Sequence, residues 1–156
     1  MFQLSKEGKE LVKKELTRYE DKLSAIIPAL YRAQKEHGWI STDVIEHLAE
    51  VMEIPSSRIA EVATFYTMFN REPVGKYHVQ VCCNISCAMA GAREILGGML
   101  EKNQVGLDEK TKDGKFTFSK VECLGSCGTA PMMQINDDYH ENLSGERADQ
   151  ILKGLK

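Results

Sequence analysis

The chain has 156 residues, of which 42% are hydrophobic and 28% are charged, and its formal net charge is −3 at pH 7. A chain of this length and composition can bury the core of one domain or of two small ones, which argues against a disordered protein. The small net charge and the lack of a long basic run argue against nucleic-acid binding. Five cysteines, an odd number, favour metal ligation or redox chemistry in a reducing compartment over a disulfide framework.

Residues 1–16 are charged and have a helical pattern, and they lack the apolar centre and the cleavage site of a secretory signal. The longest apolar stretch, residues 25–31, is interrupted by Pro28 and is too short to cross a bilayer core of about 30 Å. We therefore expect a cytoplasmic protein that meets a membrane only indirectly, through a partner.

Residues 1–74 are predicted to form a helical bundle. The expected helix starts are Ser5, Ser24, Ser41 or Thr42, and Pro55. Gly38 is expected to end the second helix in the left-handed conformation. The expected apolar faces are Leu11, Val12, Leu16 and Tyr19; Ile27, Leu30, Tyr31 and Gln34; Val44, Ile45, Leu48, Val51 and Met52; and Ile59, Val62, Ala63 and Tyr66. Residues 70–75 have the composition of a linker, so we place the domain boundary there.

Residues 75–156 are predicted to form a small α/β domain, because the hydrophobic period changes to that of a strand after Gly75. The expected elements are a strand over 76–83, a helix from Ala88 to Met99, a strand over 116–122 after the turn signal Asp113-Gly114, a hairpin of 131–136 with 139–143 across Asp137-Asp138, and a final helix through Leu155. The whole chain is therefore expected to be of the α+β class.

Two cysteine pairs follow the two predicted strands of this second domain. Cys82 and Cys87 form a C-x4-C pair, and Cys123 and Cys127 form a C-x3-C pair. A 2Fe-2S cluster needs four thiolates, two on each iron, and two loops with one pair each supply this number. Cys83 adjoins the first pair, so a C-x3-C pair of Cys83 with Cys87 is an alternative that spacing alone leaves open.

Four thiolates carry more negative charge than the cluster core neutralises, so burying them requires hydrogen-bond donors. We expect backbone N–H groups near Gly125, Ser126 and Gly128 to donate to sulfur. A helix that begins near Ala88 is expected to direct its positive N-terminal end toward Cys87.

Other sites of cysteine chemistry are less consistent with the spacing. A structural zinc site is the main alternative, although zinc sites commonly use C-x2-C or nearby spacings because one ion gathers all four sulfurs. Rieske ligation needs histidines near the cysteines, and none of His37, His47, His78 and His140 has that spacing. A thioredoxin-type dithiol needs a C-x-x-C motif, which the sequence lacks.

Six segments taken together resemble one family: GWIS (38–41), VATFY (62–66), PVGKY (73–77), VC-x4-C (81–87), DGKFT (113–117) and VECLGSC-x-x-AP (121–131). The chain resembles the thioredoxin-like 2Fe-2S subunit of the NADH dehydrogenase module of respiratory complex I, the NuoE family. The resemblance runs from about residue 27 to residue 152 and rests on the order of the segments rather than on any one of them.

The resemblance implies that Cys82, Cys87, Cys123 and Cys127 are the cluster ligands and that Cys83 is not. It implies a helical bundle (1–74) followed by a thioredoxin-like domain (75–156) with one 2Fe-2S cluster. It further implies a partner flavoprotein subunit, which alone binds NADH, FMN and a 4Fe-4S cluster. The large apolar groups near the end of the bundle are expected to contact this flavoprotein: Trp39, Phe65, Tyr66, Met68 and Phe69.

The function implied by the resemblance is electron transfer within NADH:quinone oxidoreductase, with single electrons exchanged between the partner's FMN and the cluster, and with no independent activity of the isolated chain. Such a complex lies on the cytoplasmic face of the inner membrane. The alternatives are the equivalent subunit of an NAD-linked hydrogenase or formate dehydrogenase and, from another class, a zinc-stabilised interaction module. No glycine-rich dinucleotide loop is present in the sequence.

Overall fold

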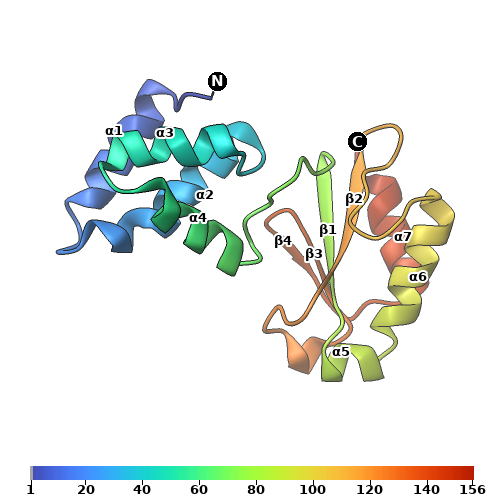
Figure 1. Ribbon diagram of the computed structural model, residues 1–156. Coiled ribbons are helices and arrows are strands. Elements are labelled where there is room, and N and C mark those ends of the chain that lie inside the picture. Colours follow the sequence, from blue (N-terminus) through green and yellow to red (C-terminus); the bar gives the residue numbers. More distant parts are fainter. Residues whose placement is uncertain (1) are drawn as a thin grey trace. The chain divides into compact units, whose positions relative to one another are not determined.

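The computed structural model describes residues 2–156, which form two compact units divided between Pro73 and Val74. The first unit is helical and the second combines helices with a sheet (Figure 1), and each has its own hydrophobic core. No helix within residues 2–156 is long and apolar enough to span a membrane.

Three helices of the first unit begin where the sequence indicates, after Ser5, Ser41 and Pro55, whereas the second begins at Ile26 because the expected start, Ser24, lies in a 3₁₀ turn before it. The elements of this unit are α1 (Lys6–Leu16), the 3₁₀ turn η1 (Lys22–Ala25), α2 (Ile26–His37), α3 (Thr42–Met52) and α4 (Ser56–Phe65). The hydroxyls of Ser5 and Ser41 accept hydrogen bonds from the N–H groups of Gly8 and Val44, in the first turns of α1 and α3, and Gly38 ends α2 with a φ of 91°. These three caps confirm the predictions made for them.

The buried face of α2 differs from the predicted one. Ile26, Ala29, Leu30 and Ala33 are buried, whereas Tyr31 is 50% exposed. The alanines carry the core face because their small side chains fit where neighbouring helices pack closely, and a search for large apolar residues overlooks them. The side chain of Gln34 binds the chain after α4 instead, since it donates to the carbonyl of Met68 and accepts from the N–H of Asn70.

Two more predicted positions in this unit lie outside the helices. Tyr19 follows the end of α1 and Tyr66 follows the end of α4, and both side chains are exposed. The predicted faces of α3 and α4 are otherwise partly confirmed, because Val44, Leu48 and Met52 in α3 and Ile59 and Ala63 in α4 are buried.

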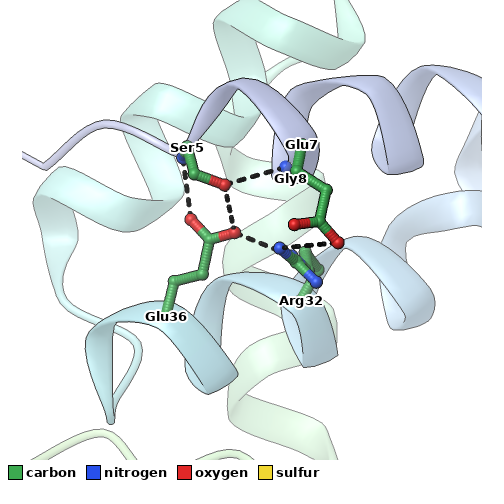
Figure 2. A network of polar contacts seen from close by, with 5 residues as sticks. All are labelled: Ser5, Glu7, Gly8, Arg32 and Glu36. Atoms are coloured by element: carbon green, nitrogen blue, oxygen red, sulfur yellow. Dashed lines mark hydrogen bonds and ion pairs between the residues drawn. The ribbon is translucent and has the colours of Figure 1, made fainter.

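A polar network joins the start of α1 to the end of α2 (Figure 2). The Glu36 carboxylate accepts hydrogen bonds from the Ser5 N–H and the Ser5 hydroxyl, each at 2.8 Å, and from Nε of Arg32 at 2.7 Å. Arg32 also lies 3.8 Å from the carboxylate of Glu7. A Cβ at Gly8 would collide with the Glu36 carboxylate, so glycine at this position makes room for the network.

The second unit contains a four-stranded mixed sheet with the strand order β2-β1-β3-β4. Its elements are β1 (Tyr77–Cys82), α5 (Ile85–Met89), α6 (Ala92–Asn103), β2 (Phe116–Val121), the 3₁₀ turn η2 (Cys127–Thr129), β3 (Met133–Ile135), β4 (Asp138–His140) and α7 (Gly145–Gly154). Strand β1 is parallel to β2 and antiparallel to β3, and β3 is antiparallel to β4.

Both long helices of this unit lie on the same side of the sheet in Figure 1, and their apolar faces share one core with it. Val79, Val81 and Phe118 are buried toward this core together with Leu96 of α6 and Leu152 of α7. Because strand side chains alternate between faces, the residues between them in β1 and β2 point to the opposite face of the sheet, which is more polar.

The chain just before β1 lies so close to strand β2 that position 75 requires a glycine. The N–H of Gly75 donates to the hydroxyl of Thr117 at 2.9 Å. A Cβ at Gly75 would lie 2.6 Å from the carbonyl carbon of Phe116, so any larger residue would collide with backbone. Gly75 therefore holds the start of β1 against β2, in agreement with the parallel pairing of the two strands.

Two predictions for the second unit are corrected by the structure. The helix expected from Ala88 to Met99 is two helices, because Gly91 adopts a φ of 89° and breaks the chain between α5 and α6. The hairpin turns at Asn136-Asp137, one residue earlier than predicted, because Asn136 takes a positive φ of 53° and its side chain binds the N–H of His78.

Candidate metal centre

The two cysteine-bearing loops leave the same edge of the sheet. Cys82 is the last residue of β1 and pairs in register with Val121, the last residue of β2. Because β1 and β2 are neighbouring parallel strands, their carboxyl ends lie side by side, and so do the loops that follow them. The loop after β1 carries Cys87, and the loop after β2 carries Cys123 and Cys127.

The first loop buries its thiols. Cys82 is 3% exposed, and its Sγ lies 3.6 Å from the carbonyl oxygen of Glu122 in the other loop. Cys87 is equally buried and lies in the first turn of α5, which begins at Ile85 where the side chain of Asn84 caps it. The prediction that a helix begins just after Cys87 is therefore wrong, because the Asn84 cap starts the helix three residues earlier.

The second loop leaves its thiols accessible. Cys123 and Cys127 are both exposed. Gly125 takes a φ of 77°, which directs its N–H to the Sγ of Cys123 at 3.3 Å. The expected donation to sulfur is thus confirmed for Gly125. Among the described residues, the backbone N–H groups of Ser126 and Gly128 make no such bond.

Three thiols from the two loops interact electrostatically. Burial raises the pKa of the Cys87 thiol. A hydrogen bond with the Cys82 thiol and charge repulsion from Cys82 and Cys127 raise this pKa further. A hydrogen bond with the backbone of Met132 acts in the opposite direction and lowers it. These effects favour the protonated form of the Cys87 thiol, so binding of a metal at Cys87 would require the loss of that proton.

Cys83 differs from its neighbour Cys82 in the direction of its side chain. It continues the alternation of Val79 and Val81 toward the helix-covered face, where it is 4% exposed. Its N–H donates to the carbonyl of Val121 at 2.9 Å, and burial raises the pKa of its thiol. The structure thus gives Cys83 a place in the hydrophobic core.

The donor set fits a thiolate-bound cluster in type and arrangement. Two loops meet at one sheet edge, Cys82, Cys83 and Cys87 lie at the end of β1 and in the loop after it, Cys123 and Cys127 lie in the loop after β2, and a backbone donor already faces the sulfur of Cys123. Within residues 2–156, no three His, Cys, Asp or Glu side chains gather closely enough to surround a single metal ion.

A polar contact that sequence reasoning missed connects the second loop to the chain after β4. The Glu141 carboxylate accepts hydrogen bonds from the hydroxyls of Ser126 and Thr129, on either side of Cys127. Tyr139 donates its hydroxyl to the carbonyl of Leu124 at 2.8 Å. The sequence signal for this contact is weak, since it depends on how β4 pairs with β3.

Comparison with known proteins agrees with this geometry. The family model for thioredoxin-like 2Fe-2S ferredoxins matches residues 12–156. The chain belongs to the thioredoxin-like 2Fe-2S ferredoxin family. The cofactor of this ferredoxin-family chain is therefore a 2Fe-2S cluster, as the sequence predicts, and the resemblance stated from the motifs is confirmed.

The similar proteins of this ferredoxin family cover almost the whole chain. An E subunit of the NADH-quinone oxidoreductase of Rhizobium meliloti is 43% identical over 148 residues, which are 95% of this chain and 88% of that protein. The E subunit of the NADH-quinone oxidoreductase of Rickettsia bellii is 43% identical over 158 residues, with 99% of this chain and 95% of that protein covered.

The fold of this ferredoxin-family chain is also found among solved structures. A chain of an NAD+-reducing NiFe hydrogenase in the air-oxidised state matches with a TM-score of 0.72 and 20% sequence identity. The match covers 82% of this chain and 22% of the hydrogenase chain, so the present chain corresponds to about a fifth of that protein. The predicted α+β class with a thioredoxin-like second unit is confirmed.

Proposed function

We propose that this chain is an electron-transfer subunit of NADH:quinone oxidoreductase, equivalent to the E subunit of that complex. The observation that carries the proposal is the pair of cysteine loops at one sheet edge, in a chain that is 43% identical to such E subunits over nearly its whole length. When bound, a 2Fe-2S cluster accepts and returns one electron at a time.

Cys82, Cys87, Cys123 and Cys127 are the ligands in this proposal, with one pair on each iron. The parallel pairing of β1 and β2 supports it, because the two loops then start side by side at the carboxyl ends of these strands. Gly125 contributes a donor to the sulfur of Cys123, which offsets part of the charge on the thiolate. Cys83 is not a ligand in this proposal, because the alternation of the strand puts its side chain on the same face as Val79 and Val81 and opposite to that of Cys82.

The chain acts in this proposal as a redox subunit without a catalytic site of its own. Its sequence has no glycine-rich dinucleotide motif, so NADH, FMN and a 4Fe-4S cluster are assigned to a flavoprotein partner. The cluster domain (75–156) carries the electron and the helical domain (1–74) contributes to assembly. Attachment to this partner places the chain on the cytoplasmic face of the inner membrane.

The equivalent subunit of an NAD-linked hydrogenase or formate dehydrogenase is the second candidate. The fold shared with an NAD+-reducing hydrogenase chain favours it, but that likeness is at 20% identity and concerns the fold. The 43% identity to E subunits of NADH-quinone oxidoreductases is the reason to prefer the quinone-linked complex.

The proposed function has a direct test. We expect NADH to bleach the visible absorption of the anaerobic protein only when the flavoprotein subunit is present, because the chain has no nucleotide site. Bleaching by NADH without the flavoprotein would contradict the assignment of the nucleotide site to the partner. The absence of bleaching when the flavoprotein is present would contradict the proposed electron transfer itself.

The end of α4 is the part of the helical unit that best fits a contact with the flavoprotein. Phe65 is 78% exposed, and together with Tyr66, Val62 and Glu61 it lines a shallow depression. Exposed aromatic side chains in such a position are typical of interface cores. Phe69, which was also expected to contact the partner, is buried in the bundle and is removed from the proposed contact.

Replacing Phe65 by alanine should weaken co-purification with the flavoprotein. A buried aromatic anchor of an interface is worth at least about 1.4 kcal/mol, so the dissociation constant is expected to rise about tenfold or more. Leu23→Ala is the matched control, because Leu23 is another exposed apolar residue of the same unit. Equal affinities of the Phe65→Ala and Leu23→Ala variants would exclude α4 as the contact.

A further inference from the structure

Glu141 occupies a position beside the second cysteine loop that no ligand assignment explains. One of its carboxylate oxygens, Oε1, accepts from the hydroxyl of Thr129 at 2.6 Å and from the hydroxyl of Ser126. Ser126 directly precedes Cys127, and Thr129 follows it by two residues. A single carboxylate oxygen thus holds the loop on both sides of Cys127.

Backbone contacts hold the same two segments together. The N–H of Asn142 donates to the carbonyl of Thr129 at 2.8 Å, and the N–H of Leu143 donates to the carbonyl of Pro131 at 2.9 Å. The hydroxyl of Tyr139 reaches the carbonyl of Leu124. The segment 139–143 is therefore bound along the loop that carries Cys123 and Cys127, and Glu141 is its charged contact.

The charge of Glu141 is present at neutral pH. The hydrogen bonds from Ser126 and then from Thr129 lower the pKa of the Glu141 carboxyl below its ordinary value of 4.5. A fixed negative charge makes the addition of a further negative charge nearby less favourable, and solvent and salt reduce this effect without removing it at short range.

We propose that Glu141 is a positioning residue of the cluster site, which fixes the loop around Cys127 through Ser126 and Thr129 and lowers the reduction potential by its negative charge. This inference rests on the ligand set proposed above. Because Ser126 is bound to Glu141, its hydroxyl donates to a carboxylate and is withheld from sulfur, and this acts on the potential in the same direction.

The test uses the full-length protein with its cluster and the variant Glu141→Gln. Glutamine keeps an oxygen that can accept from both hydroxyls and removes only the charge. We expect the ratio of reduced to oxidised protein at a fixed ambient potential to rise about three- to tenfold, and tenfold corresponds to about 59 mV for a one-electron couple. The measurement is a spectroelectrochemical titration.

Two comparisons separate charge from structure. Glu101→Gln removes an exposed carboxylate from the last turn of α6, at the end of that helix away from α5, and should leave the potential unchanged. The difference between wild type and Glu141→Gln should shrink as salt rises from about 0.01 M to about 1 M, because the Debye length falls from about 30 Å to about 3 Å.

A second variant reports the positioning role in the metal-free protein. Glu141→Ala removes the acceptor as well as the charge, so the backbone N–H of Thr129, which binds the carbonyl of Ser126, should exchange with solvent several-fold faster. In Glu141→Gln this exchange should stay close to that of wild type. Unchanged exchange in Glu141→Ala would overturn the positioning role.

The outcomes distinguish this inference from the proposed function. If the wild-type protein holds no 2Fe-2S cluster, the proposed function fails, and the protein has no cluster reduction potential to compare. If the wild-type protein holds the cluster and Glu141→Gln has the same potential at low salt, the inference about Glu141 fails and the proposed function stands.

Discussion

Replacing Cys87 by alanine is expected to remove the 2Fe-2S cluster from the purified protein. Cys87 and Cys82 are the two proposed ligands of one iron, so the loss of Cys87 leaves that iron with a single protein ligand. Iron content should fall from about two atoms per chain to near zero, together with acid-labile sulfide and visible absorption. Cys82→Ala, Cys123→Ala and Cys127→Ala are expected to behave in the same way.

Cys83→Ala is the matched control for this series, because Cys83 is adjacent to a proposed ligand and equally buried. Its side chain continues the core-facing alternation of Val79 and Val81, so the variant should keep a full cluster and lose only packing. The opposite pattern, with cluster loss in Cys83→Ala and retention in Cys82→Ala, would show that the C-x3-C pairing with Cys87 is the correct one.

Replacing Glu36 by alanine is expected to destabilise the helical unit by about 1–3 kcal/mol, because three hydrogen bonds to a charged carboxylate are lost. The donors are the N–H and hydroxyl of Ser5 and Nε of Arg32 (Figure 2). Trp39 is the only tryptophan and lies in this unit, so its fluorescence during urea unfolding reports the loss.

Glu61→Ala provides the comparison for an ordinary surface ion pair. Glu61 pairs with Arg58 on α4, and the side chains of both residues are more than half exposed, so the variant should change stability by less than about 1 kcal/mol. Equal changes in the free energy of unfolding for Glu36→Ala and Glu61→Ala would show that the network at the start of α1 stabilises the bundle no more than a surface ion pair does.

The contribution of Glu36 should depend on pH in a defined direction. Burial by itself raises the pKa of Glu36, but the hydrogen bonds from Ser5 and Arg32 outweigh it and lower the pKa below its ordinary value of 4.5. A lowered folded-state pKa gives stability that is present above the ordinary pKa and is lost as the pH falls through the folded-state pKa. The difference between wild type and Glu36→Ala should therefore be constant near neutral pH and shrink in acid.

Local chemistry made several features predictable from the sequence. Ser5 and Gly38 cap helices through their own side-chain or backbone properties, and Cys82 marks the end of a strand whose alternation is plain. The two groups of cysteines could be recognised from their short spacings, although the choice between Cys82 and Cys83 rests on the family resemblance.

The features that were missed depend on packing between distant segments. The core face of α2 is carried partly by Ala29 and Ala33, whose small size matters only when neighbouring helices approach. The contact of Glu141 with Ser126 requires the pairing of β4 with β3, which brings together residues that are far apart in the chain. The Asn84 cap places Cys87 inside a helix, and the left-handed Gly91 separates this short helix from α6.

Metal and sulfide analysis of the wild-type protein, purified without oxygen and examined by electron paramagnetic resonance after dithionite reduction, tests the presence of the cluster most directly. We expect about two irons and about two acid-labile sulfides per chain, with a one-electron signal that appears on reduction. Stoichiometric zinc without iron or sulfide would contradict the assignment of a 2Fe-2S cluster to the two cysteine loops.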